Sequence, residues 1–112
     1  MLLDEVSIKE LLSILIDNAI KHSYKNSTIN INLKSNGNNI VLLVKNKGDN
    51  ISSEDREKIF ERFYRVDKSR NRKNNRYGLG LAIAKNIVLN HNGEIIVESD
   101  NHITTFKALF KK

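Results

Sequence analysis

Two pairs of apolar segments, each pair joined by a short turn, most strongly constrain the fold of this chain. In residues 28–34 apolar and polar side chains alternate strictly, which is typical of a strand with one solvated face. The pair Asn36-Gly37 that follows is favoured in two-residue hairpin turns. The next apolar run is continuous, which indicates a more central strand. The predicted strands cover residues 28–34, 39–46, 94–99 and 103–110.

Three further segments have helical features. The first begins with a capping box in which Ser7 is the N-cap and Glu10 its reciprocal partner, and its apolar residues recur at helical spacing. Gly93 can take the left-handed conformation that ends a helix. The predicted helices cover residues 8–23, residues 54–63, and the segment from the Gly78-Leu79-Gly80 stretch to Asn92.

The order of these elements is helix, hairpin, short helix, helix, hairpin. It lacks the alternation of strand and helix that builds a parallel sheet, so we expect antiparallel pairs with the helices on one face. The predicted fold class is α/β, a two-layer sandwich with a mixed, mostly antiparallel sheet and three helices on one face. A chain of 112 residues suffices for one such domain with one core, spanning residues 1–112.

Composition narrows the possible functions. The chain has no cysteine, which excludes a disulfide framework and a thiolate metal site. No apolar run approaches the roughly 20 residues of a membrane helix, and the first residues do not read as a signal peptide. We therefore expect a cytoplasmic location without direct membrane contact. The net charge of +6 favours an anionic partner, which can be a nucleotide, a nucleic acid or an acidic protein face.

Much of the positive charge lies in residues 67–76, which contain five Lys or Arg and no aliphatic residue. Such a segment cannot pack into a core. It can be a solvated loop, a short basic arm for nucleic acid, or a lid that folds over an anionic ligand. Its position between an aromatic-anchored short helix and a glycine-bearing helix start favours the lid.

A polar patch interrupts the apolar face of the first helix. Asn18 lies on the core-facing side, and Lys21 and His22 follow it at helical spacing, so the three side chains point the same way. An amide oxygen suits Mg²⁺, and a Lys suits a phosphate. A lone Asn in this position more often caps a neighbouring strand or loop, but the trio favours a ligand site.

The third helix begins at the glycine-bearing stretch Gly78-Leu79-Gly80. Free N–H groups and the helix dipole at such an N-terminus favour a bound phosphate. The alternative is an ordinary loop-to-helix junction in which the glycines allow close packing, because a Gly-x-Gly pattern alone is weak evidence.

Four segments, in this order, resemble the sequence boxes of the catalytic ATP-binding domain of bacterial two-component sensor histidine kinases. This family belongs to the gyrase, chaperone and kinase ATPase superfamily, and it implies a Bergerat-type ATP-binding fold. Each box alone is weak evidence, but all four at the family spacing are specific, and together they cover nearly the whole chain. The boxes are residues 16–23 (N box), 44–51 (first glycine box), 59–70 (F box) and 77–85 (second glycine box).

The resemblance implies ATP and Mg²⁺ as ligands and assigns roles at the phosphate end of the site. Asn18 would bind Mg²⁺, and Lys21 and His22 would contact phosphate oxygens. The other implied contacts to the phosphates are Arg65, Arg70, Gly78, Leu79, Gly80 and Leu81.

At the adenine end the resemblance implies contacts from Asn46, Gly48 and Ile51. Asn46 replaces the usual Asp, which accepts a hydrogen bond from the adenine amino group. The amide oxygen can accept the same bond without charge, which predicts a weaker interaction. Asn50 replaces the second glycine of its box, and Arg76 replaces the first glycine of the last box. These departures affect the expected affinity more than the expected fold.

The resemblance also implies a function. The domain would donate the γ-phosphoryl group of ATP to a His on a separate dimerising helical domain of the same parent protein, which would pass it to a response regulator. No His of this chain stands in the phosphoacceptor context, so the chain is expected to be a catalytic fragment, truncated at its N-terminus, of a membrane-anchored parent. Nucleic acid is not an expected partner.

Three other functions stay open at this point. A degenerate nucleotide-sensing module would explain the substitution at Asn46, and a basic nucleic-acid-binding module would explain the net charge. A gyrase-type ATPase that hydrolyses ATP with water is disfavoured, because its general-base Glu has no counterpart in residues 14–17.

Overall fold

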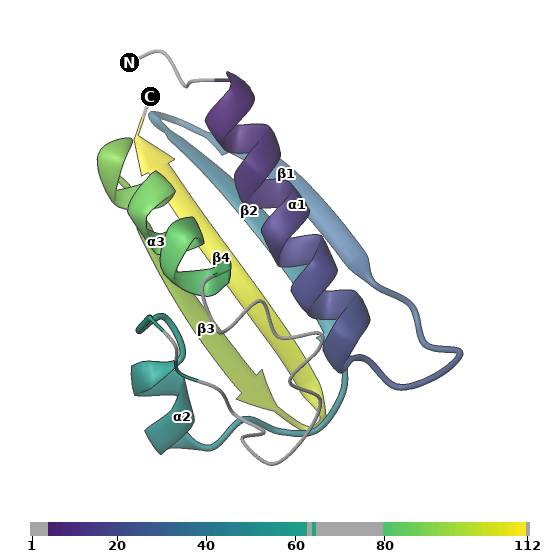
Figure 1. Ribbon diagram of the computed structural model, residues 1–112. Helices are drawn as coiled ribbons and strands as arrows, with labels where there is room; N and C mark the ends of the chain where they lie inside the picture. Colours follow the sequence, from purple (N-terminus) through teal and green to yellow (C-terminus); the bar gives the residue numbers. More distant parts are fainter. Residues whose placement is uncertain (1–4, 63, 65–79, 112) are drawn as a thin grey trace.

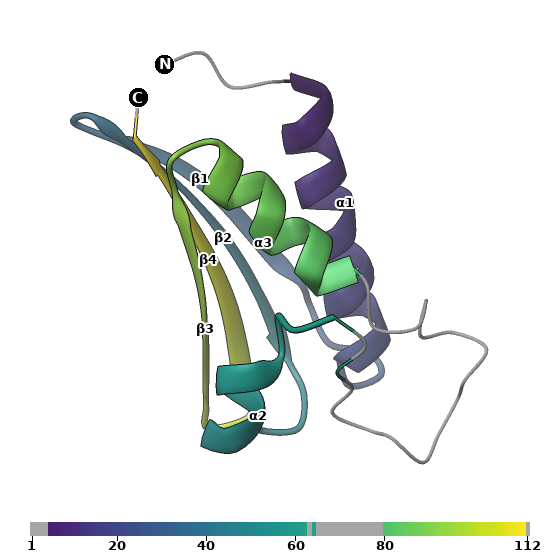
Figure 2. The same ribbon diagram turned by 60° about the vertical axis from the view of Figure 1, so that its left-hand side comes forward.

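The computed structural model describes residues 5–62, 64 and 80–111. Within these residues the chain forms two layers, a four-stranded sheet and helices that lie on one of its faces (Figures 1 and 2). This confirms the predicted α/β sandwich. The elements, in chain order, are α1 (Glu5–His22), β1 (Asn30–Asn36), β2 (Asn39–Lys47), α2 (Ser53–Lys58), α3 (Gly80–Asn90), β3 (Glu94–Asp100) and β4 (Ile103–Lys111).

The strand order of the sheet is β1-β2-β4-β3, and each neighbouring pair is antiparallel. The two predicted hairpins, β1–β2 and β3–β4, therefore lie side by side and are joined through β2 and β4. The register pairs Val44 with Phe106 and Asn46 with Thr104. Residues paired in this way point to the same face of the sheet, so the register decides which side chains of β2 and β4 meet under the helices.

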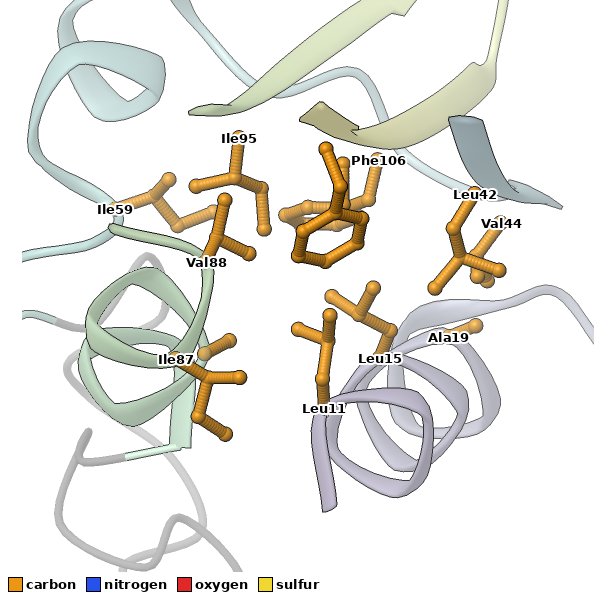
Figure 3. Close-up of a cluster of buried hydrophobic side chains, with 13 residues drawn as sticks. Leu11, Leu15, Ala19, Leu42, Val44, Ile59, Ile87, Val88, Ile95 and Phe106 are labelled. Carbon is orange, nitrogen blue, oxygen red and sulfur yellow. The ribbon is translucent and has the colours of Figure 1, made fainter. Parts of the chain in front are cut away.

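The core lies between the helix-facing side of the sheet and the helices α1 and α3 (Figure 3). Helix α1 contributes Leu11, Leu15 and Ala19, each fully buried at helical spacing. Phe106 of β4 is also fully buried, and its ring packs edge-to-face against Phe60 at 6.1 Å between centroids. None of the helices in the described part of the chain is long and apolar enough to cross a bilayer.

Two predicted boundaries differ from the structure. Helix α1 begins at Glu5, so Ser7 lies inside the helix and is not its N-cap. In the first hairpin Asn36 pairs with Asn39, so the central residues of the turn are Gly37 and Asn38 and not Asn36 and Gly37. Gly37 has a φ of 59°, which is the conformation that a tight hairpin turn requires at its first central residue.

The end of α3 also differs from the prediction. Asn92, with a φ of 58°, takes the left-handed conformation that was expected at Gly93. Gly93 is needed for a different reason, because a Cβ atom there would lie 2.2 Å from the carbonyl oxygen of Leu109. The glycine therefore allows the chain leaving α3 to pass close to β4.

Strand β1 is only partly covered by α1. Ile31 and Leu33 pair with Val44 and Leu42, so they point to the helix-facing side of the sheet. Their partners are buried, but Ile31 is 48% exposed and Leu33 is 69% exposed. The apolar face that the alternation predicts is therefore correct, but within the described residues its outer part has no covering layer.

Candidate functional site

The start of α3 lies against α1. Gly80 is the first residue of α3, and a Cβ atom there would lie 3.6 Å from Cγ2 of Ile14, which is ordinary van der Waals contact. Asn18 lies one turn beyond Ile14 on the same side of α1. Both ribbon views place the beginning of α3 beside the C-terminal half of α1. The structure thus brings the predicted polar patch and the glycine-bearing helix start to the same region.

The three residues of the polar patch differ in exposure. Asn18 is half-buried, whereas Lys21 and His22 are exposed in the last turn of α1. The half-buried position agrees with the prediction that Asn18 lies on the core-facing side of the helix. A positive charge in the last turn also interacts favourably with the negative end of the helix dipole, so Lys21 stabilises α1 whether or not a ligand is bound.

The loop after β2 is attached directly to the end of α1. Ser23 and Gly48 form an isolated antiparallel bridge, and the N–H of Tyr24 donates to the carbonyl oxygen of Lys47 at 2.8 Å. A Cβ atom at Gly48 would lie 2.3 Å from the carbonyl oxygen of His22. Glycine is therefore required at position 48, because the two backbones meet there.

The first glycine box contains Asn46, which forms a buried polar pair with Thr104 of β4. Asn46 is 3% exposed and Thr104 is 4% exposed, and the sheet register places them opposite each other on the helix-facing side. A Cβ atom at Gly48 would lie 3.2 Å from Nδ2 of Asn46, so the amide group lies beside the glycine of the loop. Thr104 was not expected from the sequence. Alternation along β4, which puts Thr104 in line with Phe106, was the signal that could have found it.

Ile51 is held by both of its backbone polar groups. Its N–H donates to Oγ of Ser99 at 2.8 Å, and its carbonyl oxygen accepts from Arg56 at 2.8 Å. Arg56 also donates to the carbonyl oxygen of Ser99 at 3.1 Å, and Oγ of Ser99 lies 3.2 Å from Oγ1 of Thr104. The half-buried Ile51 side chain packs against the core. Arg56 and Ser99 were not expected from the sequence, because Ser99 lies far along the chain from both Ile51 and Arg56.

The short helix α2 begins as predicted and ends earlier. Oγ of Ser52 accepts from the N–H of Asp55 at 3.1 Å, so Ser52 is the N-cap, but α2 ends at Lys58 and not near residue 63. The hydroxyl of Tyr64 donates to the carboxylate of Asp55 and so ties the chain after α2 back to its first turn. This hydrogen bond is the main cause that raises the pKa of Tyr64 to about 12.

The pKa of Tyr64 gives a testable prediction. The change Asp55→Asn removes the carboxylate, so the pKa of Tyr64 should fall from about 12 toward its ordinary value of 10.0. Because the folded-state pKa is the higher one, the bond stabilises the fold below pH 10, and this contribution is lost as the pH rises through about 12. Ultraviolet titration of the tyrosines measures the shift. The control Glu61→Gln should change it little, and an unchanged pKa in Asp55→Asn would contradict the assignment.

The remaining predicted residues divide into two groups. Leu81 follows Gly80 in the first turn of α3 and packs, half-buried, against the core. Arg65, Arg70, Gly78 and Leu79 lie outside the described residues, as does the basic segment 67–76. Their predicted roles at the terminal phosphates therefore stay predictions.

Comparison with known proteins shows the family. Residues 3–112 match the family described as histidine kinase-, DNA gyrase B-, and HSP90-like ATPase. The chain is 42% identical over 97 residues to the sensor protein CiaH of Streptococcus pneumoniae, which is 87% of this chain and 22% of the relative. It is 46% identical over 104 residues to the signal transduction histidine-protein kinase ArlS of Staphylococcus haemolyticus, which is 92% of this chain and 23% of the relative.

Solved structures agree with this assignment. The catalytic domain of histidine kinase ThkA superposes with a TM-score of 0.84 at 30% identity, covering 98% of this chain and 69% of that chain. The mycobacterial sensor histidine kinase MprB superposes with the same TM-score at 26% identity, covering 96% of this chain and 74% of that chain. The chain spans less than a quarter of the length of the sensor kinases CiaH and ArlS. This chain belongs to the family of histidine kinase-, DNA gyrase B- and HSP90-like ATPases and corresponds to the ATP-binding catalytic domain of sensor histidine kinases.

Proposed function

We propose that this domain binds ATP with Mg²⁺ and donates the γ-phosphoryl group to a His on a separate dimerising helical domain of its parent protein. That His would then pass the group to a response regulator. The observation that carries the proposal is a pair of contacts along the C-terminal half of α1. Gly80, at the start of α3, lies beside Ile14, and Gly48, in the loop after β2, meets the backbone of His22. The similarity to sensor kinases several times longer than this chain supports the two partners.

We assign the adenine end to the buried polar pair of β2 and β4. Asn46 offers an amide oxygen to the adenine amino group, and Thr104 lies opposite it at the same level of the sheet. Ile51, whose backbone is held by Ser99 and Arg56, offers an apolar surface for the ring. Because these groups lie on central strands and on a fixed loop, little would need to move before the base binds.

We assign the phosphate end to α1 and the start of α3. Lys21 and His22 would contact phosphate oxygens, and Lys21 would offset part of their charge. The N–H groups of Gly80 and Leu81 begin a helix whose dipole favours an anion. We assign the parts outside the described residues, Arg65, Arg70, Gly78 and Leu79, to the terminal phosphates. This chain would therefore act by positioning and by charge neutralisation, which is the usual protein contribution to phosphoryl transfer.

The donor set suits Mg²⁺ and does not suit a metal held by protein ligands alone. Among the described residues there is no group of three or more His, Cys, Asp or Glu that could hold a metal ion. Mg²⁺ commonly binds through one or two protein oxygens together with substrate phosphates and water, so the amide oxygen of Asn18 would suffice. When bound, Mg²⁺ would offset the negative charge of the phosphates.

Calorimetric titration with ATP, with and without MgCl₂, tests the proposal. We expect binding that MgCl₂ strengthens, and Asn18→Ala should remove this strengthening and weaken binding in MgCl₂ by about 10- to 100-fold. The circular dichroism spectrum of Asn18→Ala should match that of the wild type. Asn32→Ala, on the outer face of β1, is a control and should bind normally. Absence of binding at millimolar ATP would overturn the proposal, and unfolding of Asn18→Ala would make that residue structural.

A further inference from the structure

A cluster of three side chains joins segments that are far apart in the chain. The hydroxyl of Tyr24, just after α1, donates to Oδ1 of Asp49 at 2.9 Å. The same hydroxyl lies 3.0 Å from Nδ1 of His102, in the turn between β3 and β4. The rings of Tyr24 and His102 lie 6.1 Å apart at 43°. None of these three residues is among the predicted nucleotide contacts.

The direction of the two hydrogen bonds determines the protonation of His102 at Nδ1. A tyrosine hydroxyl has one proton, and in this cluster it is donated to Asp49. The hydroxyl oxygen must therefore accept from His102, so Nδ1 of His102 carries a proton. In this cluster His102 donates to the hydroxyl oxygen of Tyr24, and the hydroxyl of Tyr24 donates to the carboxylate of Asp49.

Backbone hydrogen bonds reinforce the same three segments. The N–H of Gly48 donates to the carbonyl oxygen of His102 at 2.9 Å, and the N–H of His102 donates to Oδ1 of Asn50 at 2.8 Å. His102 has a φ of 61°, so the turn between β3 and β4 is held in a left-handed conformation where it faces the loop after β2. The residues after α1, the loop after β2 and this turn therefore form one linked unit.

We propose that Tyr24, Asp49 and His102 are positioning residues that hold the adenine-binding loop at a set place relative to the end of α1. On one side of the cluster is the end of α1, with Lys21 and His22, and on the other is the loop from Asn46 to Ile51. A nucleotide that contacts both sides requires a defined spacing between them, and the cluster adds side-chain hydrogen bonds to the backbone bridge between Ser23 and Gly48. The inference rests on the proposed function, because it concerns how the same site is held.

Nucleotide affinity measured next to stability tests the inference. Tyr24→Phe removes the shared hydroxyl and should weaken Mg-ATP binding by about three- to tenfold. The matched control is Ser27→Ala, because Oγ of Ser27 donates to the carbonyl oxygen of Tyr24 and touches neither Asp49 nor His102. Ser27→Ala should lower the unfolding midpoint to a similar degree and leave the affinity unchanged.

A second pair of variants examines His102. His102→Ala should weaken Mg-ATP binding as Tyr24→Phe does, and the double variant should be no weaker than either, because both remove the same connection. His102→Asn should restore binding, since an Asn amide can donate from nearly the position of Nδ1 and tolerates a left-handed φ. Rescue by Asn supports a positioning role, and failure of rescue would contradict it.

Three results of the titrations with wild type, Tyr24→Phe and Ser27→Ala would overturn the inference. The first is a Tyr24→Phe affinity equal to that of the wild type, and the second is an equal loss in Tyr24→Phe and Ser27→Ala. The third is a wild-type domain that does not bind ATP, which would refute the proposed function and the inference together. The cluster can be checked without nucleotide, because the hydrogen bond to Asp49 raises the pKa of Tyr24, and Asp49→Asn should lower it. A normal pKa for Tyr24 would refute the cluster while leaving the proposed function standing.

Discussion

Replacing Gly48 with alanine is expected to destabilise the domain and to weaken nucleotide binding at the same time. The new Cβ atom would lie 2.3 Å from the carbonyl oxygen of His22, which is backbone and cannot rotate away. The bridge between Ser23 and Gly48 must then open, and the loop after β2 must move from the end of α1. We expect the free energy of unfolding to fall by about 1–3 kcal/mol, as measured by urea denaturation.

Gly80 provides the matched control for Gly48. It also lies in the proposed site, but among the described residues a Cβ atom there would meet only Cγ2 of Ile14, at 3.6 Å. Because Gly80 is the first residue of α3, alanine should leave the stability unchanged or raise it by up to about 1 kcal/mol. Equal destabilisation by Gly48→Ala and Gly80→Ala would contradict the explanation, because it would mean that the contact with His22 is not the cause.

Replacing Phe106 with alanine should have the largest effect on stability. The side chain is fully buried on the central strand β4, and it packs against Phe60 and the helices (Figure 3). Loss of a buried aromatic side chain costs about 3–5 kcal/mol, including the cavity that remains. In a domain of this size each kcal/mol lowers the midpoint of thermal unfolding by roughly 4–8 °C, so calorimetry should detect the change easily.

Leu33 is the control for Phe106 on the same face of the sheet. It is 69% exposed on the edge strand β1, so Leu33→Ala should change the free energy of unfolding by no more than about 0.5 kcal/mol. A cost comparable to that of Phe106→Ala would show that Leu33 is covered in solution.

The fold could be predicted because its sequence signals are local and periodic. The spacing of Leu11, Leu15 and Ala19 identifies the buried side of α1, and the alternation of Phe106 and Phe110 identifies that of β4. Local patterns could not predict which of two neighbouring residues takes a given conformation when the sequence signal of both is the same. Both Asn92 and Gly93 can take a left-handed φ, and the choice between them depends on the contact of Gly93 with β4.

Residues of the candidate site could be predicted only where they lie within one of the four sequence boxes, each of which is a continuous segment. Asn18 and Gly48 lie in such boxes, and the structure brings their segments toward each other. The hydrogen bonds of Ser99 to Ile51 and of His102 to Tyr24 join residues that lie far apart in the chain. Such contacts have no signal in the sequence, because each partner alone is an ordinary polar residue.

The position of β4 has a consequence for how the chain acquires its structure during synthesis. This strand lies in the middle of the sheet, between β2 and β3, but it is translated after both of them. Until β4 leaves the ribosome, the nascent chain can form α1 and one hairpin. The position beside Val44 that Phe106 occupies in the finished sheet is still empty at that stage. We therefore expect the domain to gain its stability in one late step, with its apolar surface exposed to chaperones until then.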